Sequence, residues 1–201
     1  MKKISLLITL VVSFGINAQI STNNTVASGY NSTAIGSSTT ASGDYSTAIG
    51  LNTTASGDYS TAMGSGTTAS HYYSTAMGRI TTASGINSTA MGYYTEASGN
   101  YSTSIGVLTK ASDKSSLVMG QYNLAGSTVT SSATEFSLDN TAFVIGNGTD
   151  SDNRSDALVV KFNGETTLAG SVTATSFIGD GSQLTNLPLL FSYNSNQAGG
   201  I

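Results

Sequence analysis

Residues 32–50 read STAIGSSTTASGDYSTAIG, and residues 46–64 read STAIGLNTTASGDYSTAMG. The second phrase repeats the first one fourteen residues further along the chain. Glycine recurs at this interval seven times, and a large apolar residue precedes it each time. These apolar residues are Ile35, Ile49, Met63, Met77, Met91, Ile105 and Met119. Such strict spacing predicts a repeat architecture rather than a disordered Gly/Ser-rich linker.

Each repeat is expected to form one coil of a solenoid. Fourteen residues are too few for a pair of helices, and the copies show no helical apolar pattern. They suit two short strands joined by two glycine-assisted turns. Stacked coils would pair each strand with its equivalent in the next coil, about 4.8 Å away. We therefore predict an all-β fold, a parallel β-roll (solenoid) of 14-residue coils followed by a small β-rich module.

Alternation along a strand predicts which side chains face the inside of a coil. Only alanine and similarly small residues can fill so narrow a coil, which places Ala34 and Ala41 inside. Ile35 and its equivalents must then point outward and form a continuous apolar stripe. A stripe of this kind requires a cover. The cover is either another domain of the same chain or identical rods arranged about a parallel axis.

The sequence NSTAIGSSTTASGDYSTAIG, residues 31–50, resembles the head repeats of trimeric autotransporter adhesins, the YadA-like heads. The resemblance covers about residues 25–126. It implies a left-handed β-roll, a homotrimer held by the Ile/Met positions, and a place outside the cell, either secreted or associated with the cell surface or outer membrane. The family often has valine two positions before the isoleucine, where this chain has threonine, as at Thr33. That departure implies a more polar trimer interface.

The flanking segments divide the chain further. Residues 1–18 have the layout of a secretory signal peptide, since residues 4–14 are too short an apolar run to span a membrane. Residues 19–126 are the predicted head repeats, and residues 127–187 the β-rich module. Within the module, residues 157–170 predict a hairpin with its turn at Asn163–Gly164, and residues 172–187 resemble modules of trimeric phage tail fibres and bacterial surface fibres. Residues 188–201 are a C-terminal tail with neither heptads nor barrel strands, so we expect that membrane anchoring is not encoded in this chain. Either the chain is a truncated piece of a longer product, or it is released or anchored in another way.

The composition argues against most chemistry. The net charge is −4, so no basic patch is expected to attract nucleic acid. No cysteine is present, and the single histidine, His71, is expected to be an exposed turn residue. Residues 147–156 are weakly similar to a calcium loop, but a solvated loop fits them better. Asp44 and Asp58 occupy equivalent positions, whereas paired catalytic carboxylates need different environments. We predict no enzyme, no metal site and no cofactor.

Two rows of side chains are candidates for binding. The first consists of tyrosines at one coil position: Tyr45, Tyr59, Tyr73 and Tyr101. They either contact a glycan or matrix protein on a host or environmental surface, or simply pack over their neighbours. The second row consists of outward threonines: Thr40, Thr54, Thr68 and Thr82. The predicted function is an adhesin-type head that attaches by multivalent contacts. The alternatives are a structural fibre or spacer and, less favoured, an ice-binding solenoid.

Overall fold

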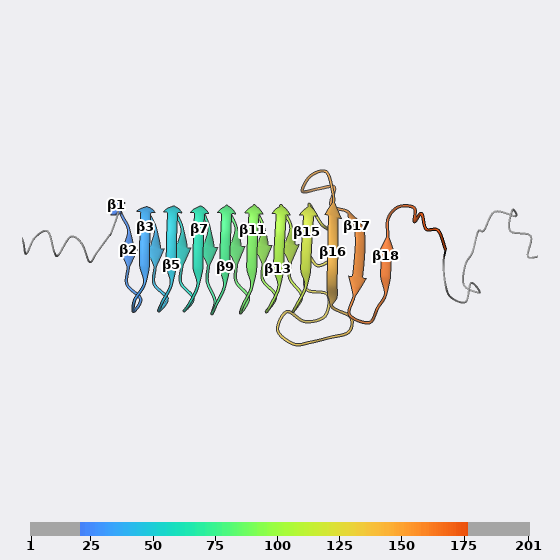
Figure 1. Cartoon of the computed structure of the whole chain (residues 1–201), viewed down its shortest axis with the longest axis horizontal. Helices are drawn as coiled ribbons and strands as arrows, with labels where there is room; N and C mark the ends of the chain where they lie inside the picture. The colour runs from blue at the N-terminus through green and yellow to red at the C-terminus, as the bar shows by residue number, and fades with distance from the viewer. Residues whose placement is uncertain (1–20, 177–201) are drawn as a thin grey trace, which may run out of the picture. The chain divides into compact units, whose positions relative to one another are not determined.

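The computed structural model of the protein describes residues 21–176 (Figure 1). The predicted signal peptide and the predicted tail at residues 188–201 lie outside the described residues, as does most of the fibre-like sequence at residues 172–187. Of the described residues, 21–170 belong to one compact unit, and a second unit begins at Ser171. The eighteen described strands all lie in the first unit.

Each repeat forms one long strand and one short strand. The long strands are β3 (Thr33–Ser37), β5 (Thr47–Leu51), β7 (Thr61–Ser65), β9 (Thr75–Arg79), β11 (Thr89–Tyr93), β13 (Thr103–Val107) and β15 (Leu117–Gln121). The short strands are β2 (Val26–Ala27), β4 (Thr40–Ala41), β6 (Thr54–Ala55), β8 (Thr68–Ala69), β10 (Thr82–Ala83), β12 (Glu96–Ala97) and β14 (Lys110–Ala111). One further strand, β1 (Ser21–Asn23), precedes them.

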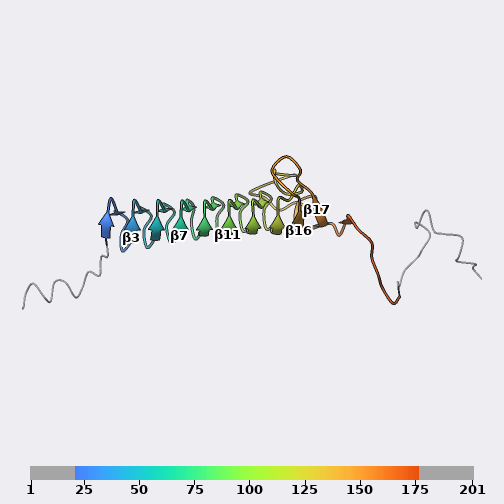
Figure 2. The ribbon, with the colours of Figure 1, turned by 90° about the horizontal axis from the view of Figure 1, so that it is seen from above.

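Equivalent strands of successive coils pair in parallel. The long strands form one sheet in the order β1-β3-β5-β7-β9-β11-β13-β15, and the short strands form a second sheet in the order β14-β12-β10-β8-β6-β4-β2. Thr33 pairs with Thr47, and Ile35 pairs with Ile49. This register continues without a shift to β15. The predicted parallel β-solenoid is therefore confirmed, and Figure 2 shows its coils from above.

The glycine at the end of each repeated phrase lets neighbouring coils approach closely. From Gly36 to Gly106 these glycines have φ angles between 122° and 130°, a region that side chains with a Cβ atom rarely enter. A Cβ atom on Gly78 would overlap the carbonyl oxygen of Gly92 in the next coil. The fixed glycine in the repeat is thus a requirement of coil stacking.

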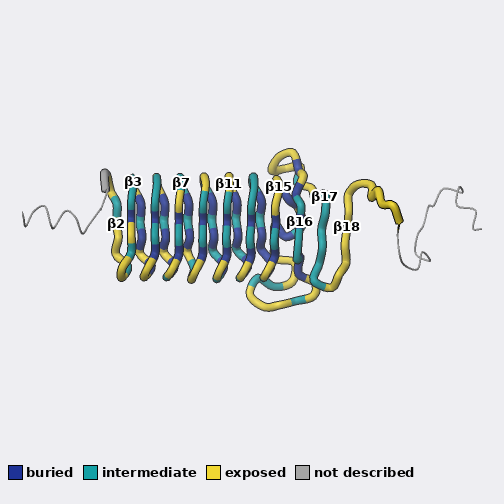
Figure 3. The backbone as a smooth tube through the Cα atoms, in the orientation of Figure 1, coloured by how far each residue is buried: buried dark blue, intermediate teal, exposed yellow. Residues whose placement is uncertain are grey.

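Columns of small side chains fill the inside of the solenoid. Ala34 and Ala41 are 3% and 0% exposed, which confirms that they face inward. Their equivalents as far as Ala97 are also buried. Threonine and serine columns that begin at Thr39 and Ser46 lie inside as well, and Figure 3 shows these buried bands in the coils from β3 onward. Ten interior hydroxyl oxygens have no hydrogen-bond partner within residues 21–176, so the interior gains little stability from them.

A further strand joins the long-strand sheet after the regular repeats. β16 (Thr141–Asn147) pairs in parallel with β15 and places Ile145 beside Met119 and Gly146 beside Gly120. Twenty-six residues separate these two glycines, twelve more than in the regular repeat. The added residues form the loop drawn in yellow beneath β15 and β16 in Figure 1. The long-strand sheet therefore continues beyond the last regular repeat.

Two antiparallel strands complete this sheet. β17 (Asp156–Lys161) pairs with β16, and β18 (Thr166–Leu168) pairs with β17. The predicted hairpin turn is confirmed, since the Gly164 N–H donates to the Lys161 carbonyl at 3.0 Å. Nearby, Ala111, Val118 and Val144 form a second buried cluster. The core is therefore more apolar at this end than in the regular coils.

Asn123 closes the open end of the short-strand sheet. In the coil before it, the Glu96 N–H donates to the carbonyl of Thr109, 2.9 Å away. At the next coil the Lys110 N–H donates instead to the side-chain Oδ1 of Asn123, at 2.8 Å. The Asn123 Nδ2 donates back to the Lys110 carbonyl at 3.0 Å. A side-chain amide thus takes the place of the backbone of a further coil.

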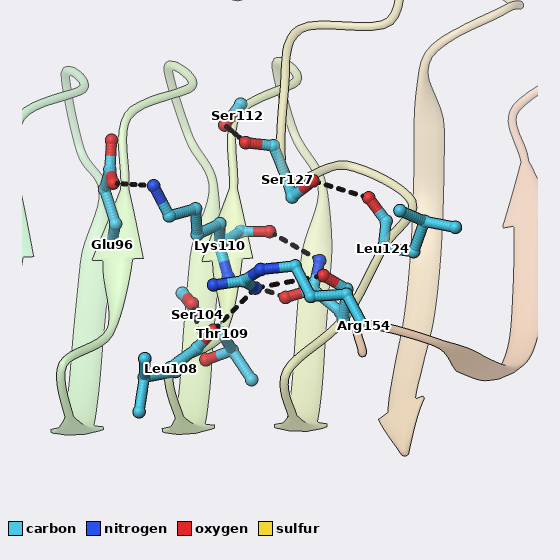
Figure 4. A network of polar contacts seen from close by, with 10 residues as sticks. Glu96, Ser104, Leu108, Thr109, Lys110, Ser112, Leu124, Ser127 and Arg154 are labelled. Carbon is cyan, nitrogen blue, oxygen red and sulfur yellow. Dashed lines mark hydrogen bonds and ion pairs between the residues drawn. The ribbon is translucent and has the colours of Figure 1, made fainter. Parts of the chain in front are cut away.

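Charged side chains secure the same end. Arg154 Nη1 donates to the carbonyls of Leu108 and Asn123, at 3.0 and 3.1 Å (Figure 4). The Asp156 carboxylate accepts the N–H of Leu124 at 2.9 Å. Arg154 and Asp156 thus bind backbone groups of the last coils through their charged side chains, so they act as an end cap.

Asp113 anchors the inserted segment to the last regular coil. Its carboxylate is buried and accepts the N–H of Thr130 at 2.6 Å. It also accepts the N–H and the O–H of Thr141, at 2.8 and 2.6 Å. These charge-assisted hydrogen bonds compensate for burying the carboxylate. We call four of these side chains together the end cap: Asn123, Arg154, Asp156 and Asp113.

Candidate interaction surfaces

The outer face of the long-strand sheet carries an apolar ladder. It consists of the seven residues predicted to point outward, Ile35, Ile49, Met63, Met77, Met91, Ile105 and Met119, and each is paired with the next. Met63 and Met119 are 40% and 36% exposed. The other five are partly exposed. Since the alanines occupy the inside, these side chains contact one another only along the outside of the rod.

The ladder continues across the strands that follow the repeats. Ile145 pairs with Met119 on one side and with Leu158 on the other. Leu158 in turn pairs with Leu168, which is half exposed. Directly paired residues share a face of the sheet. The apolar face therefore extends from β3 to β18.

A second row on the same face changes its chemistry along the rod. It starts with threonine at Thr33 and keeps threonine as far as Thr103. At the next strands the paired residues are Leu117, Phe143 and Val160. The threonines expected to make an interface more polar are thus confined to the earlier coils, and both rows are apolar at the end-cap side.

The outer face of the short-strand sheet is polar. Thr40, Thr54, Thr68 and Thr82 lie in register and are partly exposed. Glu96 and Lys110 continue the row and form a salt bridge of 3.0 Å between Oε2 and Nζ, visible in Figure 4. This face has no apolar ladder, so it is suited to contact with water.

The tyrosine row forms a stack along the turns that lead into the long strands. The rings of Tyr45 and Tyr59 are nearly parallel, with centroids 5.0 Å apart. Those of Tyr59 and Tyr73 are 4.9 Å apart. Tyr30 meets Tyr45 edge-on at 5.5 Å. Both faces of Tyr59 are therefore covered by neighbouring tyrosines, which leaves its edge and hydroxyl for solvent.

The stack raises the pKa of the Tyr59 phenol above its ordinary value of about 10. Burial by the neighbouring rings is the largest cause, followed by Tyr73 and Tyr45 and then by the carboxylates of Asp58 and Asp44. Each of these effects disfavours the phenolate.

His71 and the acidic loop contribute to local structure. His71 lies in the predicted turn but is half buried, because its Nδ1 accepts the Tyr72 N–H at 2.9 Å and its ring packs against that of Tyr72. In the loop, hydrogen bonds from the side chain and N–H of Asn153 and from the N–H of Asp152 lower the pKa of Asp150. Residues 21–176 contain no group of three or more His, Cys, Asp or Glu side chains placed to hold a metal ion. They also contain no helix both long and apolar enough to cross a membrane.

Comparison with known proteins identifies the repeats. Residues 27–53, 55–79, 83–107 and 97–123 match the family described as YadA head domain repeat (2 copies). The matches cover the regular coils and end before β16. No curated protein gives a significant match.

YadA-family heads are trimeric, and adhesins of this family are displayed on the cell surface. The repeats belong to adhesin structural domains that are typically non-enzymatic. The fourteen-residue register, the inward alanines and the matched residues agree with one another. The β-solenoid of this chain therefore consists of YadA head domain repeats.

Proposed function

We propose that three copies of this chain pack their long-strand sheets around a common axis and form an adhesin head that attaches through many weak contacts. The apolar ladder carries this proposal, because it is continuous and lies on the outside of a single chain. Burial of each isoleucine or methionine contributes roughly 1.5–3 kcal/mol relative to full exposure. The small-residue interior provides little apolar surface, so the assembly depends on the ladder.

Residue Met77 lies near the middle of the ladder and tests the interface. It pairs with Met63 and Met91, and all three are apolar neighbours. Met77→Asp places a carboxylate from each copy close to the axis, where unpaired buried charges cost several kcal/mol each. Thr68→Asp is the matched control, since Thr68 pairs with Thr54 and Thr82 on the polar face.

Light scattering on the purified protein measures the effect. We expect a trimer for the wild type and for Thr68→Asp, and a smaller species or a dissociating one for Met77→Asp. A monomeric wild type would overturn the trimer. A trimeric Met77→Asp together with a dissociated Thr68→Asp would place the interface on the other sheet.

We propose that the tyrosine row takes part in attachment, since its exposed edges and hydroxyls lie along the side of the rod. Asparagine is a suitable replacement, because Asn31 and Asn87 occupy the same coil position with φ angles of 51° and 53°. The test variant changes all members of the row to asparagine: Tyr45, Tyr59, Tyr73 and Tyr101.

Binding of wild type and variant to immobilised glycans, matrix proteins and cells decides between attachment and a spacer role. A head should bind at least one surface and lose that binding in the variant while it remains trimeric. A spacer should bind none. An ice-binding solenoid should instead show thermal hysteresis. The salt bridge between Glu96 and Lys110 interrupts the threonine row and therefore disfavours ice binding.

A further inference from the structure

The tyrosine row is interrupted at Asn87, between Tyr73 and Tyr101. The backbone there matches that of the tyrosines: φ is 53° at Asn87, and its N–H donates to the Tyr72 carbonyl at 2.9 Å. The N–H of Tyr101 donates to the carbonyl of Ile86 in the same way, at 2.7 Å. The carboxamide of asparagine reaches less far than a phenol ring. The row therefore lacks one ring at a position where the backbone accepts one.

The interruption lies between two aromatic rings of the row, one in the coil before it and one in the coil after it. Centroid distances of 5.0 and 4.9 Å along the stack mean that two coils displace a ring by about 10 Å. A group midway between Tyr73 and Tyr101 would thus lie about 5 Å from each ring. Tyr73 and Tyr101 are 53% and 55% exposed, whereas Tyr45 and Tyr59 are 46% and 49% exposed. The two tyrosines that border Asn87 are the more open ones.

Contacts within the same chain indicate which group suits such a face. The guanidinium carbon of Arg79 lies 5.3 Å from the ring centroid of Tyr93, and Lys114 Nζ lies 5.8 Å from that of Tyr101. Lys114 belongs to the coil after Tyr101, so it covers the side of that ring away from Asn87. Cations within about 6 Å of a phenol ring are attracted to its face. The net charge of −4 also favours a basic partner.

We propose that the interruption at Asn87 binds the guanidinium group of an arginine side chain from a basic protein partner. A guanidinium is planar and can contact both rings at once, and it is more weakly hydrated than an ammonium group. The carboxamide oxygen of Asn87 supplies an acceptor for one of its N–H groups. This assignment rests on the attachment function proposed above, because it names a partner group for the tyrosine row.

Two reciprocal substitutions test the proposal. Asn87→Tyr completes the row and fills the space between Tyr73 and Tyr101, at a backbone position that tyrosine adopts four times in this chain. Tyr59→Asn removes the middle ring of the stack and creates a second interruption, between Tyr45 and Tyr73. Saturation-transfer NMR on the purified protein detects weak binding of free N-acetylarginine amide, with N-acetyllysine amide and N-acetyltyrosine amide as comparison probes. Circular dichroism and light scattering establish that each variant is folded and assembled as the wild type is.

We expect the arginine amide signal to fall about fivefold to tenfold in Asn87→Tyr, the loss expected for cation–π contacts, and to rise about twofold in Tyr59→Asn. An unchanged signal in Asn87→Tyr would overturn the site. A lysine or tyrosine amide signal as strong as that of arginine, and equally sensitive to Asn87→Tyr, would overturn the guanidinium assignment. The probes are free in solution, so this result does not depend on whether the head attaches to a surface. Surface attachment that fails while arginine amide still binds would count against the proposed function alone.

Discussion

The regular coils and the end cap satisfy the hydrogen-bonding groups of the backbone by different means. In a coil, the N–H at the start of the short strand donates to a carbonyl of the next coil, as that of Glu96 donates to Thr109. At the end cap there is no equivalent short strand beyond β14 in this sheet of the described chain, and the side chain of Asn123 supplies both acceptor and donor to Lys110. Repetition satisfies the backbone without any special residue, whereas an end requires individual polar side chains in fixed places.

The two regions also differ in what their side chains do. Coil interiors repeat alanine, threonine and serine, and these residues contribute close packing rather than apolar area. The end cap uses a buried carboxylate, Asp113, with three hydrogen bonds, and a separate apolar cluster around Val118 and Val144 lies at the same end. The inside of a regular coil is filled by small residues, whereas the end of the solenoid also buries the larger side chains of Val118 and Val144. The substitutions below probe each region.

The largest loss of stability is expected in the coils, from Gly78→Ala. Gly78 has a φ of 122°, and a Cβ atom there would overlap the carbonyl oxygen of Gly92. Strain and displacement of a neighbouring coil should lower the free energy of unfolding by about 3–5 kcal/mol. Denaturant unfolding at fixed protein concentration measures the loss.

Gly164→Ala is the control for this substitution. Gly164 also has a positive φ, 89°, but a Cβ atom added there would have no atom within 4 Å beyond its chain neighbours. Only backbone strain remains there, so we expect a loss of about 1–2 kcal/mol. Equal losses in the two variants would show that contact between coils contributes nothing beyond the backbone conformation.

At the end cap, Asn123→Thr restores the residue type of the coils and should cost about 1–3 kcal/mol. Threonine lacks the amide that accepts from and donates to Lys110. Amide hydrogen exchange gives a local reading, because the Lys110 N–H should lose protection in this variant. The Glu96 N–H, held by the Thr109 carbonyl, is the internal control and should keep its protection. Retained protection at Lys110 would mean that another group closes the sheet.

The smallest effect is expected at the tyrosine stack of the coils, and it depends on pH. Because the pKa of Tyr59 is raised in the folded chain, the folded state holds its proton more tightly than the unfolded state. Its contribution to stability is therefore complete below pH about 10 and is lost as the pH rises through the folded pKa. Denaturation midpoints of wild type and Tyr59→Phe between about pH 9 and pH 11 test this. The midpoint of the wild type should fall more steeply with pH than that of Tyr59→Phe. Parallel pH profiles of the two proteins would contradict the raised pKa of Tyr59.

The sequence predicts the coils well because the same pattern of residues recurs in every coil. A fixed interval, an alanine on one face and an isoleucine or methionine on the other are enough to place Ala41 inside and Ile35 outside. The hairpin at Asn163–Gly164 follows from a short-range turn signal of equal clarity.

Features that occur once are harder to predict. β16 keeps the apolar-glycine pair as Ile145 and Gly146, but the inserted residues break the interval that would have revealed it. Asp113 and Asn123 appear in the sequence as departures from the repeat, and their hydrogen bonds join distant segments that spacing does not connect. The tyrosine row is visible in sequence, whereas the covering of its ring faces depends on side-chain geometry.

The constant register also has a kinetic consequence. Strand partners in the coils lie fourteen residues apart in a chain of 201, a relative contact order of about 0.07, which is in the range of rapidly folding helical bundles rather than of other all-β domains. Any coil can therefore serve as a nucleus from which its neighbours propagate. The longest loops are closed by the end cap, where Arg154 reaches back forty-six residues to Leu108 and Asp113 reaches forward twenty-eight residues to Thr141. Each doubling of loop length adds only about 0.6 kcal/mol of closure entropy, so these longer contacts add a modest cost to a fold whose coils close short loops.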